Sequence, residues 1–455
     1  MKDIQLLMFS LALLALLLSF IDLKLGVIII IFSLFIPISI GNFMGIPSLL
    51  VLEAFTPLFV LYIVLNKIIT QENICFFRKK NNPLLYYFLF YFIWIFFEFF
   101  RHSAGIGIGR RVLFSFFLCF LLTLGLTELI SEKNRKQILS YIFLISTFVV
   151  LLGLFLIFLP GLQSIILKLE SLNLLSKENH ILSASWSVGH FKKALFGFYR
   201  IGFLQNTAPL SFLFLVSGIF NIRKSIRITG IVFFLILIII SGGRSFFAGT
   251  LMALASMLII KKKKKSIPLL LTLGITIFII AFLNYESLPG PLKRIFFWKG
   301  SLEELDPGRS ALFFMFLDGI LEHPFIGQGF VSFRFVKSEN ELLDFLAHQL
   351  AFGGHSTYLS LLYITGIIGL LFFFIVYIKS ISLSYKNYKQ TQKPEFLLTL
   401  LYFIYLFIPF AFGGKGADGS YFLFIGLLIG LNKLEIKGEK YDKNSPHNTE
   451  TNLFG

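Results

Sequence analysis

Apolar segments of nearly membrane-spanning length follow one another along most of the chain. A helix needs about 20 residues to cross the hydrocarbon core of a bilayer, and thirteen segments come close to that length. They lie at 4–21, 25–40, 47–66, 84–100, 111–130, 138–160, 203–221, 226–241, 245–260, 266–283, 356–378, 396–412 and 419–432. Only a short interruption with Asp22 and Lys24 separates the first two, so twelve or thirteen transmembrane helices are expected.

The composition of the chain excludes a water-soluble domain. Hydrophobic residues make up 56% of the sequence and charged residues 14%, whereas soluble domains contain about 45–50% and about 25%. A water-soluble core cannot hide this much apolar surface, so we predict an all-α fold, a polytopic membrane helix bundle. The two cysteines, Cys75 and Cys119, indicate neither a disulfide framework nor a metal site.

The basic residues orient the predicted helices. Loops on the cytoplasmic side are rich in Lys and Arg, and basic clusters alternate correctly with every predicted span after the second. The clusters on that side are Lys67 with Arg78, Lys79 and Lys80; Lys133, Arg135 and Lys136; Arg223, Lys224 and Arg227; Lys261 to Lys265; Lys379, Lys386, Lys389 and Lys393; and Lys433, Lys437, Lys440 and Lys443. Topology therefore explains the formal charge of +17, and nucleic acid is not an expected partner.

The predicted organisation is a single transmembrane domain over 1–432, followed by a cytoplasmic polar tail over 433–455 that we expect to be disordered. Two long segments, 161–202 and 284–355, are assigned to the opposite, outer side. The first has apolar residues at helical spacing and predicts an amphipathic helix in the membrane interface. In the second, a helix is expected to end at Pro324. Long loops of this kind are usually functional.

Arginine is enriched on the predicted outer side. Eight of the twelve arginines lie there, but only nine of the twenty-nine lysines. The eight are Arg101, Arg110, Arg111, Arg200, Arg244, Arg294, Arg309 and Arg334. Because guanidinium is the better bidentate partner for phosphate oxygens, this bias indicates a site for a phosphorylated lipid. For Arg101, Arg110 and Arg111, extension of the side chain to lipid headgroups is at least as good an explanation.

Four stretches around the outer segments form a recognisable set. "FYRIGFLQNTAPLSFLFL" contains Arg200 and Asn206, "SGGRSFFAGTLMALASM" contains Arg244, "PGRSALFFMFLDGILEHPFIGQGF" contains Arg309 and His323, and "GHSTYLSLLYITGIIGLLFF" contains His355. In this order, flanking a long outer loop before the last spans, they resemble the O-antigen ligase/polymerase family of bacterial inner-membrane glycosyltransferases. The resemblance covers roughly 200–375.

The four stretches match the family pattern to different degrees. "HPFIGQG" fits His-Pro-x-x-Gly-x-Gly closely. Thr207 and Ala208 replace the proline and the second asparagine of the family's Asn-Pro-Asn stretch, so Asn206 is a weaker assignment than the arginine before it. His355 takes the place of the histidine in the family's His-Asn-x-x-Leu, with Ser356 where asparagine is common.

The resemblance implies a GT-C-like fold and transfer of a glycan from a polyprenyl-diphosphate donor to an acceptor sugar hydroxyl. The resemblance also implies lipid A-core as the expected acceptor and an active site that faces the periplasm from the inner membrane. His355 is the predicted catalytic base, because imidazole accepts protons near neutral pH. The predicted substrate-binding residues are Arg200, Arg244 and Arg309 for the diphosphate, with Asn206 and Arg334 as further candidates.

The cofactor and partner predictions follow from the same resemblance. Similar enzymes act without a metal, and the outer histidines and carboxylates lack metal-ligand spacing, so no metal or other cofactor is expected. The expected partners are the lipid-linked glycan donor, the glycan acceptor (lipid A-core or a lipid-linked repeat unit) and membrane lipids.

Several alternatives stay open at the level of sequence. A polymerase that joins lipid-linked repeat units would use the same donor and similar motifs. A lipid-linked sugar transporter or flippase would favour charges or broken helices near the bilayer midplane, and here the span interiors are interpreted as nearly free of charge apart from Glu53. The alternative for His355 is a polar residue that caps a span. His323, which precedes a proline in a turn motif, is interpreted as structural.

Overall fold

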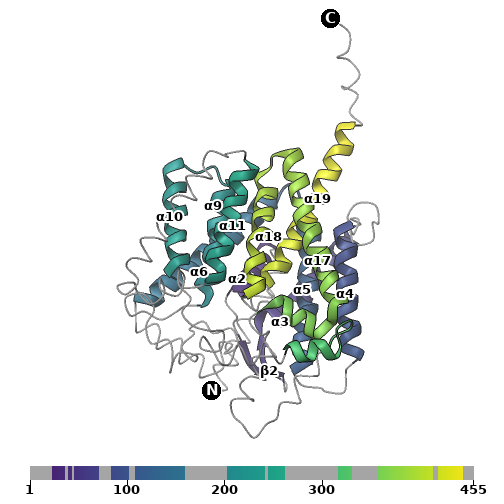
Figure 1. Cartoon of the computed structure of the whole chain (residues 1–455). Helices are drawn as coiled ribbons and strands as arrows, with labels where there is room; N and C mark the ends of the chain where they lie inside the picture. The colour runs from purple at the N-terminus through teal and green to yellow at the C-terminus, as the bar shows by residue number, and fades with distance from the viewer. Residues whose placement is uncertain are drawn as a thin grey trace, which may run out of the picture.

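The protein is a bundle of long apolar helices (Figure 1). The computed structural model describes residues 23–35, 39–43, 46–70, 83–101, 108–158, 202–240, 244–261, 316–329, 356–412 and 419–443. The helices are α2 (Leu23–Phe35), α3 (Val51–Ile69), α4 (Pro83–Arg101), α5 (Ile108–Leu129), α6 (Arg135–Phe158), α9 (Gly202–Ser217), α10 (Lys224–Ile240), α11 (Arg244–Ile260), α17 (Thr357–Thr391), α18 (Pro394–Phe412) and α19 (Gly419–Lys443). A short helical segment also covers 316–322.

The all-α membrane-bundle prediction is confirmed. Every predicted span contains a helix except 4–21 and 266–283, which lie outside the described residues. In the described part, three helical stretches are long and apolar enough to cross a membrane: Arg135–Leu152, Thr357–Thr391 and Pro394–Ala411. Shorter apolar helices are Thr56–Ile69, Pro83–Glu98, Phe117–Leu129, Thr207–Ser217 and Ser245–Ile260.

The sequence did not predict a β-hairpin between α2 and α3. Strands β1 (Ser39–Phe43) and β2 (Ile46–Leu50) pair antiparallel with an irregular register. The predicted spans 25–40 and 47–66 therefore extend too far toward each other. Proline at 37 and 47 accounts for the difference, because proline lacks a backbone donor and disfavours a continuing helix.

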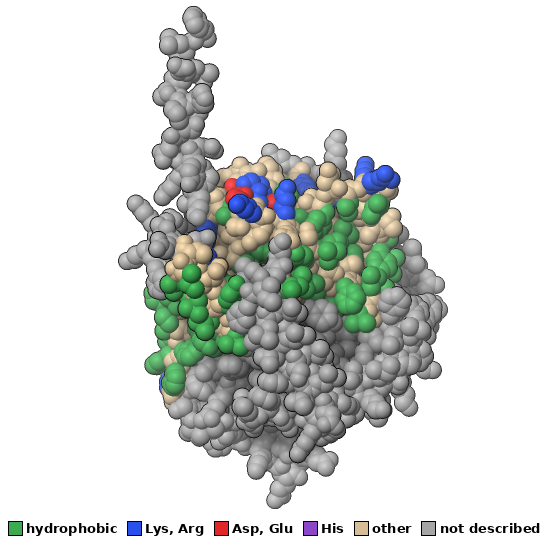
Figure 2. Space-filling view, turned by 180° about the vertical axis from the view of Figure 1, so that it is seen from behind, with side chains coloured by type: hydrophobic (Ala, Val, Ile, Leu, Met, Phe, Trp, Pro, Cys, Tyr) green, Lys and Arg blue, Asp and Glu red, His purple; other side chains and the backbone are tan. Residues whose placement is uncertain are grey.

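Helix α18 lies at the centre of the described bundle. It contacts α9, α11, α17 and α19, while α17 also contacts α4, and α19 contacts α5. Aromatic side chains fill the space between these helices; Phe373 of α17, for example, contacts Tyr91, Phe410 and Tyr421 on three other helices. Hydrophobic side chains also form a broad band on the outside of the bundle (Figure 2), as expected for a lipid-facing surface.

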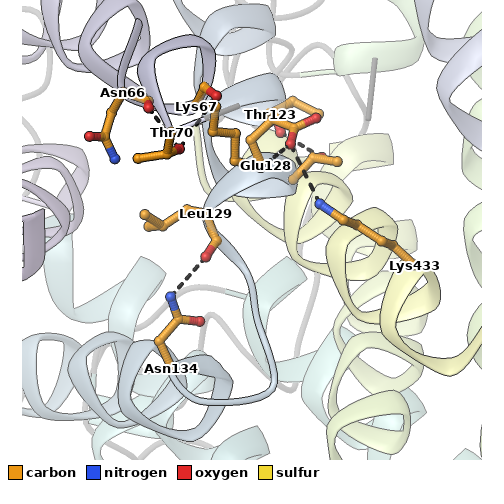
Figure 3. A network of polar contacts seen from close by, with 9 residues as sticks. Asn66, Lys67, Thr70, Thr123, Glu128, Leu129, Asn134 and Lys433 are labelled. Atoms are coloured by element: carbon orange, nitrogen blue, oxygen red, sulfur yellow. Dashed lines mark hydrogen bonds and ion pairs between the residues drawn. The ribbon is translucent and has the colours of Figure 1, made fainter. Parts of the chain in front are cut away.

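One end of the bundle carries a network of ion pairs. The carboxylate of Glu128 is fully buried, accepts a hydrogen bond from Lys67, and lies 3.5 Å from Lys433 Nζ (Figure 3). Glu435 pairs with Lys393 and lies 3.9 Å from Arg135. All four of these basic residues belong to clusters that the sequence assigns to one side of the membrane. Lys and Arg side chains also gather at one end in Figure 2.

The polar tail begins as a helix. The sequence places the end of the last span at 432 and predicts a disordered tail from Lys433, but α19 continues to Lys443. The reason is that the first charged residues after the span are not free in solvent. Lys433 and Glu435 pair with residues of neighbouring helices and hold the helix against the bundle.

Candidate functional site

Most of the predicted site residues lie outside the described residues. These are His355, Arg200, Arg309 and Arg334, together with the other outer histidines His180, His190 and His348. Arg244 is the first residue of α11 and Asn206 belongs to α9, but their side chains are not described. The structure does describe the helices that contain these residues or follow them in the sequence: α9, α11 and α17.

The starts of α11 and α17 both approach the same stretch of α18. A Cβ on Gly249, in the second turn of α11, would lie 2.5 Å from the carbonyl oxygen of Tyr405. The hydroxyl of Tyr358, in the first turn of α17, donates to the carbonyl of Phe407 at 3.2 Å. Arg244 precedes Gly249 by less than two turns of helix, so the fold brings two predicted site elements to one end of α18.

The residue after His355 caps the start of helix α17. Ser356 has extended backbone angles (φ −142°, ψ 119°), and its hydroxyl accepts from the N–H of Leu359 at 3.3 Å. This is the geometry of a helix N-cap, for which Ser and Asn are both preferred residues. Serine here and asparagine in the family can therefore both cap the helix at this position.

Helix α17 is broken at Gly366, where φ is 63° and ψ is −171°. A break inside a membrane helix leaves backbone groups without their usual partners. These groups are satisfied by residues 323–329, the "HPFIGQG" motif, which we call the His-Pro turn. The turn and the helical segment before it lie against the ends of α4 and α17 (Figure 1).

The His-Pro turn bonds to both halves of the broken helix. The N–H groups of Gln328 and Gly329 donate to the carbonyls of Tyr363 and Ile364, at 2.7 and 2.9 Å. In the other direction, Ile367 and Ile368 donate to the carbonyls of Pro324 and Phe325, at 2.9 and 3.3 Å. A third carbonyl at the break, that of the buried Thr365, accepts from the indole of Trp94 at 3.2 Å. The backbone of the His-Pro turn therefore packs into the break and supplies hydrogen-bond partners to both halves of α17.

Two glycines make this docking sterically possible. A Cβ on Gly366 would lie 2.2 Å from the carbonyl oxygen of Phe325, and one on Gly327 would lie 2.5 Å from the amide nitrogen of Gly366. Both glycines also have positive φ, which other residues rarely adopt. Contact between two backbones therefore explains Gly327 of the motif and Gly366 of α17.

An arginine and a glutamate of α4 hold the outer side of the turn. Arg101 Nη2 donates to the carbonyls of Ile326 and Gly327 at 2.7 and 2.9 Å. The same guanidinium donates to Glu98 Oε2, from Nη2 at 2.6 Å and from Nε at 3.0 Å. The sequence left two explanations open for Arg101, a phosphate site and extension to lipid headgroups; in the structure its donors bind protein acceptors instead. Sequence reasoning also missed Glu98, a fully buried charge within a predicted span.

The backbone of His323 is part of the turn, as the motif predicts, and its structural role stays an interpretation. Its N–H donates to Gly319 at 3.3 Å, and its carbonyl accepts from Gly327 at 2.8 Å. Its side chain is exposed. The predicted helix end at Pro324 is confirmed too, since the helical segment ends at Glu322.

The described residues contain no group of three or more His, Cys, Asp or Glu side chains that could hold a metal ion. The candidate residues on the outer side fall mostly outside this part of the chain, so the absence of a metal stays a prediction.

Comparison with known protein families gave a match over about a third of the chain. Residues 229–374 match the sequence model of the family described as O-antigen ligase. The matched range contains α11, the His-Pro turn and the broken part of α17, and it includes Arg244, Arg309, Arg334 and His355. Arg200 and Asn206 lie before it. No curated protein matched the chain.

Proposed function

The chain belongs to the O-antigen ligase family through residues 229–374, and on this premise we propose that it moves a glycan from a polyprenyl-diphosphate donor to an acceptor sugar hydroxyl. The family makes it an O-antigen ligase- or polymerase-type glycosyltransferase of the membrane. The observation that supports the proposal best is the match itself, because its range coincides with the stretches that carry the predicted base and two of the three predicted diphosphate ligands.

In the proposed reaction, the acceptor hydroxyl oxygen attacks the anomeric carbon of the donor glycan. The bond from that carbon to the diphosphate oxygen breaks, and the electron pair leaves on the polyprenyl diphosphate. His355 takes the proton from the attacking hydroxyl, a role that typically contributes about 10²–10⁴-fold in rate. Arg200, Arg244 and Arg309 stabilise the charge that develops on the leaving diphosphate, with Asn206 and Arg334 as further substrate contacts.

We propose lipid A-core as the acceptor and the periplasmic face of the inner membrane as the location. The alternation of basic clusters supports this orientation: the ion-paired end of the bundle, with Lys67 and Lys433, would face the cytoplasm. The starts of α11 and α17 would then face the periplasm. The same proposal includes a metal-independent reaction, in which arginines meet the diphosphate charge.

A lipid-linked sugar flippase is the alternative of another class. The break in α17 is the observation that favours it, because transporters use broken helices at their substrate sites. In transporters the freed backbone groups face the substrate or its coupling ion. Here the groups at Gly366 bond to the His-Pro turn instead, which supports an enzyme with a fixed scaffold.

The test is product analysis with the purified full chain in liposomes. The probes are a defined polyprenyl-diphosphate glycan, lipid A-core acceptor, and a metal chelator in a parallel sample. Glycan on the core sugar, unaffected by chelator, is the expected result. A ladder growing on the lipid carrier would mean a polymerase. Movement of the donor between leaflets without any transfer would overturn the proposal in favour of a flippase.

Deletion of the gene gives a second, cellular test. Loss of a ligase leaves polymer that is not attached to the core, whereas loss of a polymerase leaves single repeat units. Gel analysis of surface polysaccharide separates the two outcomes, and an unchanged polysaccharide would contradict both.

A further inference from the structure

We infer that Glu98 and Arg101 are positioning residues for the transfer reaction. The pair holds the His-Pro turn in the break of α17 and so fixes the helix start that follows His355. This inference rests on the proposed function, since it assigns to the pair a role in that reaction.

Arg101 is engaged by the protein itself. Its Nη2 group has acceptors on three residues: Ile326, Gly327 and Glu98. Only 21% of its side chain is exposed. A guanidinium reserved for a diphosphate would present its planar fork to the substrate. In the structure, Arg101 instead binds two consecutive carbonyls of the His-Pro turn.

Glu98 orients this arginine. The two residues lie one helical turn apart on α4, and both Arg101 contacts of the carboxylate are to Oε2. Its other oxygen, Oε1, is buried without a hydrogen-bond partner in the described part of the chain. A buried carboxylate in a membrane helix is costly and usually has a function. Holding Arg101 in one rotamer against the turn is such a function.

The turn is a junction between two arms of the proposed site. One arm is the helical segment at 316–322, which follows Arg309; Gln328 ties the turn to it by donating to the Gly319 carbonyl at 3.0 Å and to Glu322 at 2.7 Å. The other arm is the first part of α17, which runs from Thr357 to the break at Gly366.

The second arm leads directly to the predicted base. The helical residues between Thr357 and Gly366 extend about 13 Å at 1.5 Å per residue, and Ser356 links them to His355. A change in how the turn sits in the break would therefore displace Ser356, the residue next to the predicted base in sequence, and the segment 316–322, which follows a predicted diphosphate ligand in sequence. Misplacement by about 1 Å can reduce a rate by about 10²-fold.

The experiment compares Arg101→Gln, Arg101→Lys and Glu98→Gln with a matched control, Arg227→Gln. Arg227, in the first turn of α10 at the predicted cytoplasmic end, also donates from Nη2 to a backbone carbonyl, that of Phe220 at 3.0 Å. The full chain in liposomes is assayed with a defined polyprenyl-diphosphate glycan, and kcat and the KM for the donor are measured separately.

We expect Arg101→Gln to lower kcat by about 10- to 100-fold with the donor KM nearly unchanged. Arg101→Lys should recover much of the loss, because an ammonium still donates to the carbonyls and pairs with Glu98. Arg227→Gln should keep the kcat of the unmodified protein. An increase in KM at constant kcat would make Arg101 a substrate ligand and overturn the positioning role, as would an unchanged kcat.

Amide hydrogen exchange gives a readout that does not depend on activity. Exchange at Gln328, Gly329, Ile367 and Ile368 should become faster in Arg101→Gln and stay unchanged in Arg227→Gln. Unchanged exchange in both would overturn the inference. If the unmodified protein transfers no glycan, the proposed function fails, while exchange still reports whether the pair holds the turn. If Arg101→Gln does not accumulate, Glu98→Gln carries the same two readouts.

Discussion

Gly366 and Phe325 meet backbone against backbone: a Cβ on the glycine would lie 2.2 Å from the phenylalanine carbonyl oxygen. This contact joins a broken membrane helix to a turn about forty positions earlier in the chain. A break in lipid would leave carbonyls and amides unsatisfied, each at a cost of several kcal/mol. The His-Pro turn supplies their partners, so the break is a stable part of the fold.

Gly366→Ala should destabilise the folded protein. Its φ of 63° and ψ of −171° lie in a region essentially confined to glycine, which costs another residue about 1–3 kcal/mol, and the added methyl also collides with the Phe325 carbonyl. We expect a clearly lower thermal unfolding midpoint in detergent. Gly230→Ala in α10 is the control, because its methyl would meet only Cδ1 of the flexible Leu215 side chain. Equal midpoints for the two variants would contradict the docking role of Gly366.

The sequence predicted most helices because their signal is local. An apolar run of about 20 residues identifies a membrane helix without knowledge of its neighbours. The hairpin between α2 and α3 and the helical start of the tail were missed because they depend on pairing. Strand β1 forms only because β2 supplies its hydrogen-bond partners. The helix beyond 432 is stabilised by ion pairs of Lys433 and Glu435 with residues far away in the sequence.

The candidate site was predictable only in part, for the same reason. The "HPFIGQG" motif could be recognised, but nothing local shows that its backbone fills a break at Gly366. Arg101 donates to two carbonyls of the His-Pro turn, and these acceptors, on Ile326 and Gly327, lie more than two hundred positions away. A signal for it did exist, because Glu98 is a charge inside a span, three residues before Arg101, and such charges indicate function.

His355→Ala should abolish glycan transfer while insertion and donor binding persist. Loss of a general base lowers the rate by about 10²–10⁴-fold, and the substitution leaves the arginines in place. Transfer and binding of labelled donor are measured on the same liposomes. His323→Ala is the matched control: its side chain is exposed and its structural contacts are made by the backbone, so activity should change by no more than about twofold. Normal transfer by His355→Ala would contradict its assignment.

The hydroxyl of Ser356 should be replaceable by another N-cap. Ser356→Ala removes the acceptor for the Leu359 N–H, and loss of a cap costs about 1 kcal/mol. Ser356→Asn keeps an acceptor and should be nearly neutral. Thermal unfolding and transfer rate are compared for the two variants. If asparagine is as harmful as alanine, the serine has a role other than capping.

Glu128→Ala should destabilise the ion-paired end of the bundle. It leaves Lys67 and Lys433, each 12% exposed, without their shared carboxylate, and removing one partner of a buried pair costs about 3–5 kcal/mol. The free energy of unfolding in detergent measures the loss. Glu132→Ala is the control, because Glu132 pairs with Arg135 at 3.5 Å from an exposed position and should contribute less than about 1 kcal/mol. Similar losses for the two would contradict a special role for burial.

Substitution of Arg200, Arg244 or Arg309 by glutamine should reduce the kcat/KM for the lipid-linked donor. Removing one donor to a developing charge typically costs about 10²–10³-fold in rate, and the acceptor KM should stay constant because these residues are assigned to the diphosphate. Lysine should restore only part of the activity, since an ammonium lacks the planar fork that binds two phosphate oxygens. Arg223→Gln, at an exposed position on the predicted cytoplasmic side, is the control. Full activity of the glutamine variants would place the diphosphate elsewhere, and full activity of the lysine variants would show that positive charge alone is sufficient.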